Sequence, residues 1–447
     1  MSIKPHDYFC GFLVFEYHYR KKINETTIWD NCVLHSFIGV VRCLGAIIRQ
    51  GCGVYFGIGK EPTVGRGIGT CKGARGESLQ TSFLPNPRAM LEVENFGGEH
   101  EQEGFDGAET TLGLEQEIDI SGKRGKRVEV ADYEFEIIRQ QAIAEALSIL
   151  AETDYAFMRL AIVQERLKLA EKRLSLSEQT HETVKQRVSA AAASDIQHTK
   201  ADIERSAAEL EKSKAAAELV EAQSSLVVLI GQTSEVWEDM QVHASLESLP
   251  MLPERQALLD AVKSTPQARA NEFAKMQAES VLDIAKVETM PNPTFGLGVR
   301  RFNENDSTAL VAGLSFPLPV FDRNQGAIRA AKAGVVEVDA VARQQNLELT
   351  ASAMSAWEKL AIAHKAAQSY QNNIVPSAER AYGQASDGYS SGRFSFLDLL
   401  DAQRTLYEVQ EARLESLLAL HEAKAQVDFL MNIHEPLIKN LIEGDVK

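Results

Sequence analysis

Glycine and proline are absent from residues 126–230, and the apolar positions in this stretch follow a helical period. A 4-3-4-3-4 spacing, typical of a coiled-coil seam, runs through Ala156, Leu160, Val163, Leu167, Ala170 and Leu174. The large apolar residues stop around 189–195, where Ser194 suits the start of a returning helix. An ordinary amphipathic helix would need a partner of similar length, and only another long helix supplies one. We therefore predict a long helical hairpin with helices at about 125–187 and 195–230.

A second stretch of the same kind follows later in the chain. Residues 335–375 and 393–435 lack glycine and proline, and Gly383, Gly388 and Gly392 lie between them. This pattern predicts a second helical hairpin at about 325–432. Residues 254–289 are also helical in composition apart from Pro266.

Alternating apolar and polar positions, typical of strands, precede each hairpin. Leu112 and Leu114 share one side of the first stretch, and Leu297 and Val299 share one side of the second. We predict strands at about 88–95, 109–120, 293–302 and 308–318. Taken alone, any one of them fits a soluble hairpin, but each has about the length of a tilted transmembrane strand.

Four strands are too few to close a barrel, and an open sheet edge is not tolerated in lipid. A spanning sheet therefore needs several chains, and two or three copies would supply eight or twelve strands. The predicted fold class is mainly α with a small membrane β-barrel contribution, built from two repeats of strand, strand and long helical hairpin.

The two halves of the chain repeat each other. Residues 84–87 (LPNP) return as 290–293 (MPNP), and 122–124 (GKR) return as 322–324 (DRN), at offsets of 206 and 200 residues. We divide the chain into a first repeat at 83–232, an inter-repeat linker at 233–253, a second repeat at 254–432 and a C-terminal tail at 433–447. Residues 48–83 hold nine glycines whereas 254–289 hold none, so we expect the first repeat to lack an entering helix.

Residues 1–82 form an atypical N-terminal segment. They hold all five cysteines, and no signal peptide with a small-residue cleavage site is recognisable in them. Two interpretations stay open: a frameshift has replaced a signal peptide and a helix, which would make this chain an inactive relative, or the start is genuine. No stretch reaches the roughly 18 apolar residues of a spanning helix, so a membrane role has to use strands.

Charge and motifs exclude several functional classes. The formal net charge of −16 and the pI of about 5.2 argue against nucleic acid as a partner. No zinc-hydrolase motif, nucleophile elbow or Walker lysine occurs, so we predict no enzyme and no cofactor. His181, His198, His364 and His421 are single histidines on their helices, and we predict no metal site.

Several motifs together resemble one known family. They are residues 83–87 (FLPNP), 94–98 (ENFGG), 107–112 (GAETTL), 122–124 (GKR) and 316–326 (FPLPVFDRNQG). This set resembles the TolC-like outer-membrane efflux factors, in particular their cobalt-zinc-cadmium (CzcC-like) branch, over about residues 83–432.

The resemblance implies a homotrimer in the outer membrane with a twelve-stranded barrel, continued by a helical barrel across the periplasm. Its partners would be outer-membrane lipid, a periplasmic adaptor protein and an inner-membrane pump of the resistance-nodulation-division (RND) type. Such a channel conducts its cargo passively, here heavy-metal cations, and opens at its periplasmic tip. The alternative from another class is a soluble coiled-coil scaffold whose strands form a soluble sheet.

The resemblance also implies a pore constriction near the second hairpin tip. Residues 392–402 (GRFSFLDLLDA) match the family pattern and place Asp398 and Asp401 at the pore-facing positions, after the tip residues Gly392, Arg393 and Phe394. The alternative is a solvated helix face with Asp398 near a cap. Relatives in the multidrug branch place an arginine where Phe394 stands, so their latch chemistry is not expected here.

Acidic residues between the paired strands are candidates for an outward mouth that attracts divalent cations weakly. The alternative is ordinary solvated loop charge. These residues are Glu99, Glu101, Glu103, Asp106, Glu304 and Asp306.

Overall fold

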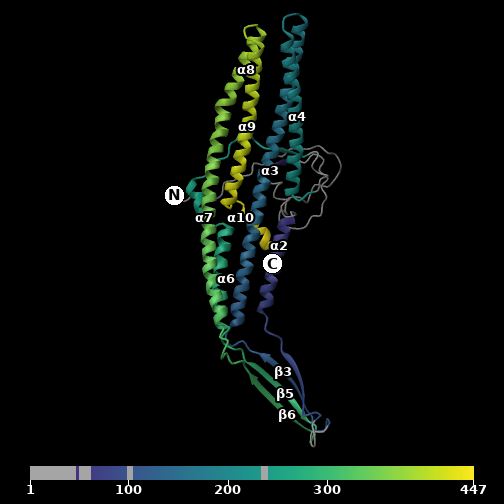
Figure 1. Cartoon of the computed structure of the whole chain (residues 1–447), viewed down its shortest axis with the longest axis vertical. Helices are drawn as coiled ribbons and strands as arrows, with labels where there is room; N and C mark the ends of the chain where they lie inside the picture. The colour runs from purple at the N-terminus through teal and green to yellow at the C-terminus, as the bar shows by residue number, and fades with distance from the viewer. Residues whose placement is uncertain (1–46, 50–61, 98–103, 233–239, 447) are drawn as a thin grey trace, which may run out of the picture. The chain divides into compact units, whose positions relative to one another are not determined.

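The computed structural model describes residues 47–49, 62–97, 104–232 and 240–446, which all lie in one unit spanning Gly45–Lys447. Two long helical hairpins and a four-stranded sheet account for most of them (Figure 1). The sheet lies at the end of the helices that is opposite the two hairpin tips (Figure 1). None of the described helices is long and apolar enough to cross a membrane.

The first hairpin consists of α3 (Lys123–Ser189) and α4 (Asp195–Leu229), close to the predicted bounds. Its seam is made of small residues at seven-residue spacing, which lets the two helices approach closely. The buried residues at this spacing are Ala201, Ala208, Ala215 and Ala222 on α4, and Ala156, Val163, Ala170, Ser177 and Val184 on α3. Of the predicted seam, Ala156, Leu160, Val163 and Ala170 are buried, whereas Leu167 and Leu174 are only half-buried.

The second hairpin has one helix in two parts. α7 (Gln325–Ser369) continues through a π-helical turn at Tyr370–Ile374 into α8 (Val375–Ser390), and α9 (Phe396–Leu430) returns. Pro376 explains the turn, because it has no N–H to donate to the preceding helical turn. Buried residues of α7 and α9, including Leu360, Leu414 and Leu420, join in the largest apolar cluster of the described residues.

A helix precedes each pair of strands. Before the second pair, the predicted 254–289 helix is divided into α5 (Arg255–Val262) and α6 (Pro266–Val287), with Thr265 capping α6 through the N–H of Ala268. Before the first pair lies α2 (Pro62–Ser82), which packs along α3. Our expectation that the first repeat lacks an entering helix is therefore wrong.

The reason for that error lies in the composition of α2. Its buried residues follow a 3-4-3-4 spacing, but they are small and include glycine: Val64, Gly67, Cys71, Ala74 and Ser78. A Cβ on Gly67 would lie 3.3 Å from Ala142 Cβ, so this glycine permits close packing against α3. Glycine lowers helix propensity, and here helix packing outweighs that cost.

The four main strands form one antiparallel sheet in the order β2-β3-β5-β6. Their bounds are Arg88–Glu94, Glu109–Glu117, Thr294–Phe302 and Ser307–Ser315. The predicted alternation is confirmed, because the register places Leu91, Leu112, Val299 and Leu310 in one row across one face. All four residues in this row are exposed, by 49% at Val299 to 88% at Leu310.

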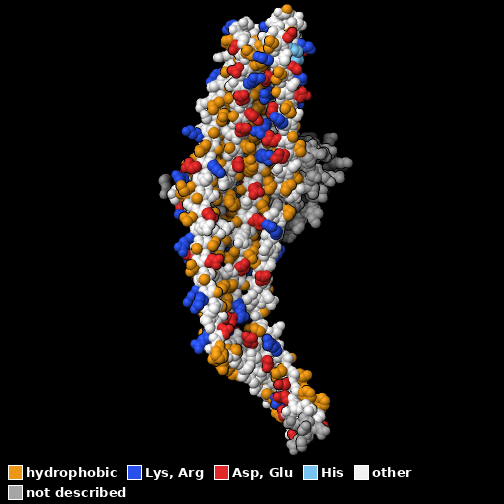
Figure 2. Space-filling view, in the orientation of Figure 1, with side chains coloured by type: hydrophobic (Ala, Val, Ile, Leu, Met, Phe, Trp, Pro, Cys, Tyr) orange, Lys and Arg blue, Asp and Glu red, His pale blue; other side chains and the backbone are white. Residues whose placement is uncertain are grey.

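Polar and charged side chains lie on the opposite face of the sheet. Arg300 is its centre: its guanidinium lies 2.8 Å from a Glu94 oxygen and 2.9 Å from a Glu109 oxygen, and it donates to Thr111 Oγ1 at 2.8 Å. Figure 2 shows apolar side chains gathered over the strands beside a group of acidic ones. The sheet is therefore amphipathic, and its apolar face has no cover within the described part of the chain.

Both repeats turn from strand to helix through a left-handed residue. Gly122 precedes α3 with φ +75°, and Asn324 precedes α7 with φ +56°. Asp119 accepts hydrogen bonds from the N–H groups of Lys123 and Arg124 at 3.1 and 2.7 Å, which satisfies the first turn of α3. The same kind of turn thus ends both repeated motifs, although Gly122 is equivalent to Asn324 and not, as the motif comparison implied, to Asp322.

Three further elements, β1 (Ile47–Arg49), β4 (Gln241–His243) and α10 (Glu435–Val446), lie outside the two hairpins and the four-stranded sheet. In the predicted linker, β4 pairs in parallel with β1, a pairing that we did not predict. The C-terminal segment, which we predicted as a tail, forms α10 and packs against α2 and α3. Ile438 and Ile442 of α10 are buried with Cys71 of α2, so this segment belongs to the core.

Candidate functional site

The second hairpin turns through a Schellman motif at the end of α8. Gly392 has φ +73°, a conformation that other residues adopt only at a cost. Its N–H donates to the carbonyl of Tyr389 at 3.0 Å, and the N–H of Arg393 donates to the carbonyl of Gly388 at 2.7 Å. The predicted tip residue Gly392 thus has a defined backbone role.

Arg393 and Phe394 complete this tip. The ring of Phe394 lies directly over Gly388, where any Cβ would collide with it, and its side chain is 49% exposed. The Nε of Arg393 donates to Ser391 Oγ at 3.0 Å. Both side chains are therefore held by the turn itself and leave an aromatic surface open.

The two candidate constriction residues differ in their surroundings. Asp398 forms a capping box: its Oδ2 accepts from the N–H and the hydroxyl of Ser395 at 2.8 and 2.7 Å, and its own N–H donates to Ser395 Oγ at 3.2 Å. The Ser395 hydroxyl and N–H lower the pKa of the Asp398 carboxyl. Asp401 is exposed and makes no hydrogen bond or ion pair to any described residue.

Asp398 and Asp401 lie on one groove beside α4, in a pocket of about 440 Å³. Lys200 of α4 and Arg404 of α9 line the same groove. The equivalent positions of the first hairpin, 201 residues earlier, hold Gln197 and Lys200. The pair of carboxylates therefore belongs to the second hairpin alone.

The two hairpins contact each other near their tips. Val184, Ala201, Phe396 and Leu400 form a small buried cluster. The Arg187 guanidinium lies 4.8 Å from the centre of the Tyr389 ring. An ion pair between Arg404 and Glu204 adds a polar contact between α9 and α4.

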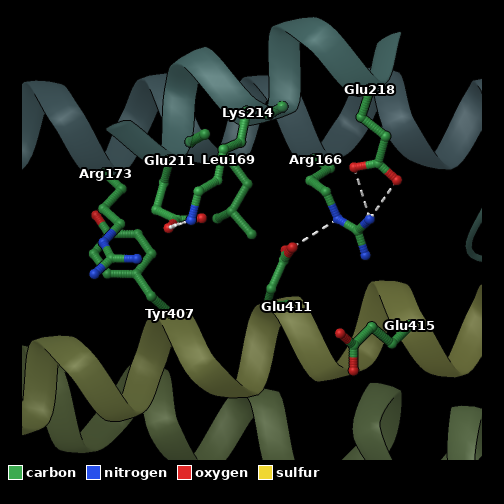
Figure 3. A pocket seen from close by; sticks show the side chains of 11 residues that line it. Arg166, Leu169, Arg173, Glu211, Lys214, Glu218, Tyr407, Glu411 and Glu415 are labelled. Carbon is green, nitrogen blue, oxygen red and sulfur yellow. Dashed lines mark hydrogen bonds and ion pairs between the residues drawn. The ribbon is translucent and has the colours of Figure 1, made fainter. Parts of the chain in front are cut away.

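A second polar contact between the hairpins lies farther from the tips (Figure 3). Arg166 of α3 donates to both oxygens of Glu218 of α4 at 2.8 and 3.0 Å, and its Nε lies 2.6 Å from Glu411 of α9. Arg173 stacks on the Tyr407 ring at 5.4 Å, and Glu415 lines the same pocket. We name Arg166, Arg173, Glu218, Tyr407 and Glu411 the inter-hairpin layer.

Burial affects the acid groups of the inter-hairpin layer. It raises the pKa of the Glu411 carboxyl, against the opposing effect of the Arg166 guanidinium. It also raises the pKa of Tyr407 to about 12. Sequence reasoning missed this layer. The available signal was Arg166, a charged residue directly before Leu167 of the predicted seam.

The acidic loop candidates are only partly described. Glu99, Glu101 and Glu103 lie outside the described residues. Asp106 and Glu304 are exposed, and Asp306, in the turn between β5 and β6, forms an ion pair with Arg301 of β5. The structure brings Glu304 and Asp306 together in that turn. Within the described residues, no group of three or more histidine, cysteine or acidic side chains is arranged to hold a metal ion.

The chain matches the family model described as outer membrane efflux protein over residues 90–232 and 258–432. These ranges cover both repeats and most of the chain, which therefore belongs to the outer membrane efflux protein family. The resemblance inferred from the strand and helix motifs is confirmed.

Two curated relatives and one solved structure show the extent of the likeness. The chain is 28% identical to the cobalt-zinc-cadmium resistance protein CzcC of Cupriavidus metallidurans over 80% of this chain and 83% of that protein. It is 25% identical to the nickel-cobalt-cadmium resistance protein NccC of Alcaligenes xylosoxydans xylosoxydans over 68% of each. A crystal structure of a membrane protein from Pseudomonas aeruginosa superposes with a TM-score of 0.73 at 16% identity, covering 85% of this chain and 89% of that one.

Proposed function

We propose that three copies of this chain form an outer-membrane channel through which heavy-metal cations leave the cell. The channel works with a periplasmic adaptor protein and an inner-membrane pump of the RND type. It catalyses no reaction and binds no cofactor, since its task is passive conduction. Opening takes place at the helical tips.

The exposed apolar face of the sheet carries this proposal. Leu91, Leu112, Val299 and Leu310 cross all four strands in one row and have no cover in a single chain. Lipid is the natural cover for such a face, and the polar face around Arg300 then lines water. β2 and β6 are open edges, which lipid does not tolerate, so the sheet has to continue into other copies.

Three copies supply twelve strands, with seven residues in β2 and nine in each of the other three. Residues of β2 and β6 then pair across subunits, and the helical hairpins of all copies continue the channel into the periplasm. The exposed tip around Arg393 and Phe394 is the surface offered to the adaptor protein. The acidic loops with Asp106, Glu304 and Asp306 face outward and attract cations weakly.

Heavy-metal cations are the proposed cargo for two reasons. The relatives named above are resistance proteins for cobalt, zinc, cadmium and nickel. In a trimer, Asp398 and Asp401 each form a ring of three carboxylates, which favours cations. Asp401 is the stronger candidate of the two, because the Asp398 carboxylate is already used in the capping box.

The assembly is tested by fractionation of cells that express the chain. We expect the protein in the outer-membrane fraction, a slow-migrating band on an unheated detergent gel, and a trimer mass in detergent by light scattering. A soluble monomer would refute the channel and favour the coiled-coil scaffold.

The cargo is tested in cells that also contain the adaptor and the pump. We expect zinc and cadmium accumulation in these cells to fall when the chain is present.

The constriction is tested with the purified channel in planar bilayers. Asp401→Asn should reduce the preference for cations over anions, whereas Glu379→Gln at an exposed position of α8 should leave this preference unchanged. Equal selectivity of Asp401→Asn and wild type would contradict the constriction.

A further inference from the structure

Two histidines that are far apart in the sequence meet across the first hairpin. His181 lies ten residues before Ala191 at the tip, and His198 lies seven residues after it. Their ring centres are 4.9 Å apart, and their planes are tilted by 44°. Figure 2 shows histidine side chains at the surface near this tip.

We propose that His181 and His198 form a two-imidazole binding site for a borderline divalent cation such as Zn²⁺ or Ni²⁺. Imidazole nitrogen is a preferred ligand of these ions. The site concerns binding at the tip and does not depend on which cargo the channel carries.

The separation of the rings fits a shared cation. With a metal–nitrogen distance of about 2.1 Å and a ring centre about 1.2 Å beyond the nitrogen, two imidazoles on one tetrahedral ion have centres about 5.4 Å apart. The observed 4.9 Å is about 0.5 Å shorter, a difference that a small rotation of either side chain would remove. A tilt between the planes is expected when two rings approach one ion from different helices.

Asp202 supplies a candidate third ligand. It lies one helical turn after His198 on α4, and its Oδ1 is 3.8 Å from His181 Nε2. This distance is too long for a finished three-ligand set, and Arg205 holds the same oxygen at 3.2 Å. A bound cation would attract the carboxylate by a small rotation, and water would fill the remaining positions.

The pair is accessible to a hydrated ion. The His181 side chain is 20% exposed and the Asp202 side chain is 52% exposed. The neighbouring residues Val184 and Ala201 are fully buried, in the apolar cluster that they form with Phe396 and Leu400 of the second hairpin. The histidines therefore lie at the edge of the seam, where packing alone does not require two imidazoles.

A cation held by α3 and α4 would join the two helices near the tip. Binding to the folded chain and not to the unfolded chain raises thermal stability. The first hairpin tip, which has alanine rather than glycine at its turn, would then become more rigid in the presence of metal.

The test is equilibrium dialysis of the full chain in detergent, purified without a histidine tag and freed of metal by a chelator. The variants are His181→Ala, His198→Ala and the double variant, with His364→Ala on α7 as the matched control. We expect wild type and the control to bind one more Zn²⁺ per chain than the double variant. Each single variant should bind that ion at least tenfold more weakly.

A second readout keeps the test decisive if a variant fails to assemble. Histidine carbethoxylation of the wild type, read by mass spectrometry, should fall at His181 and His198 when Zn²⁺ is added. Unchanged Zn²⁺ stoichiometry in the double variant, or equal modification of both residues with and without Zn²⁺, would overturn the site. Neither result bears on trimer formation or efflux, which test the proposed function separately.

Discussion

Ala191 occupies at the first hairpin tip the place that Gly392 occupies at the second. Both residues are left-handed, with φ +54° and +73°, and the N–H of each donates back into the preceding helix. For alanine this conformation costs roughly 1–2 kcal/mol relative to a right-handed one, whereas glycine adopts it freely. We predict that Ala191→Gly stabilises the chain by about 1 kcal/mol and that Gly392→Ala destabilises it by a similar amount.

Thermal unfolding of the purified protein in detergent checks this pair of changes. A Cβ on Gly392 meets no atom within 4 Å, so the expected loss is conformational rather than steric. A lower melting temperature for Ala191→Gly would show that the backbone of the tip differs from the one described here.

His421 on α9 predicts a pH dependence of stability. Burial, with a smaller effect of Lys424, lowers its pKa from 6.5 to about 4. The unfolded chain therefore binds more protons between these values, so stability is complete above pH 6.5 and falls as the pH decreases towards 4. The full loss is on the order of 3 kcal/mol.

Melting temperatures measured from pH 7 to pH 4 test this prediction. His421→Gln should flatten the profile in that window, and His364→Gln should keep the wild-type slope. A wild-type profile that is already flat between pH 6.5 and 4 would contradict it.

Among the elements, the seam of the first hairpin has the strictest steric requirement. Ala208 of α4 is 1% exposed and lies on the seven-residue repeat, whereas Ala216 of the same helix is exposed. We predict that Ala208→Leu destabilises the chain by about 1–3 kcal/mol through overpacking. Ala216→Leu keeps helix propensity and should have almost no effect, which thermal unfolding of both variants can measure.

The long helices and the main strands were predictable because the apolar positions along each of them repeat at the period of a helix or of a strand. The bounds of α3, α4 and the four main strands differ from the predicted ones by at most a few residues. α2 was missed because its seam consists of small residues such as Gly67 and Cys71, which a search for large apolar residues does not detect. The β1–β4 pair was missed because it joins residues about 200 positions apart.

At the candidate site, too, contacts between residues close in the sequence were predictable, whereas contacts between different helices were not. The capping box of Ser395 and Asp398 follows from a spacing of three residues, and the sequence alternative of a helix cap described it. The His181–His198 contact and the Arg166–Glu411 ion pair join different helices. Both histidines lie within about three helical turns of the predicted tip at 189–195, so the sequence places them at the same end of the hairpin but not in contact. The Arg166–Glu411 ion pair requires the packing of both hairpins.

At the scale of the whole molecule, the inter-hairpin layer is complete within one copy of the chain, whereas the sheet is not. The layer joins two hairpins within one chain, so it stabilises a single copy. The sheet leaves its apolar face and two edges uncovered in a single copy. Assembly should therefore respond to changes on the sheet more strongly than to changes in the layer.

Neighbouring residues of edge strand β6 give a direct test of that argument. Leu310 is 88% exposed on the apolar face, and Ala309 lies on the opposite face beside Arg300. If lipid covers the apolar face, Leu310→Asp places a charge in lipid at a cost of about 1–2 kcal/mol per chain, and the cost is incurred in every copy. Ala309→Asp places the same charge beside a guanidinium in water. We expect Leu310→Asp to reduce the outer-membrane trimer several-fold and Ala309→Asp to preserve it, measured on unheated detergent gels; equal yields would mean that lipid does not cover this face.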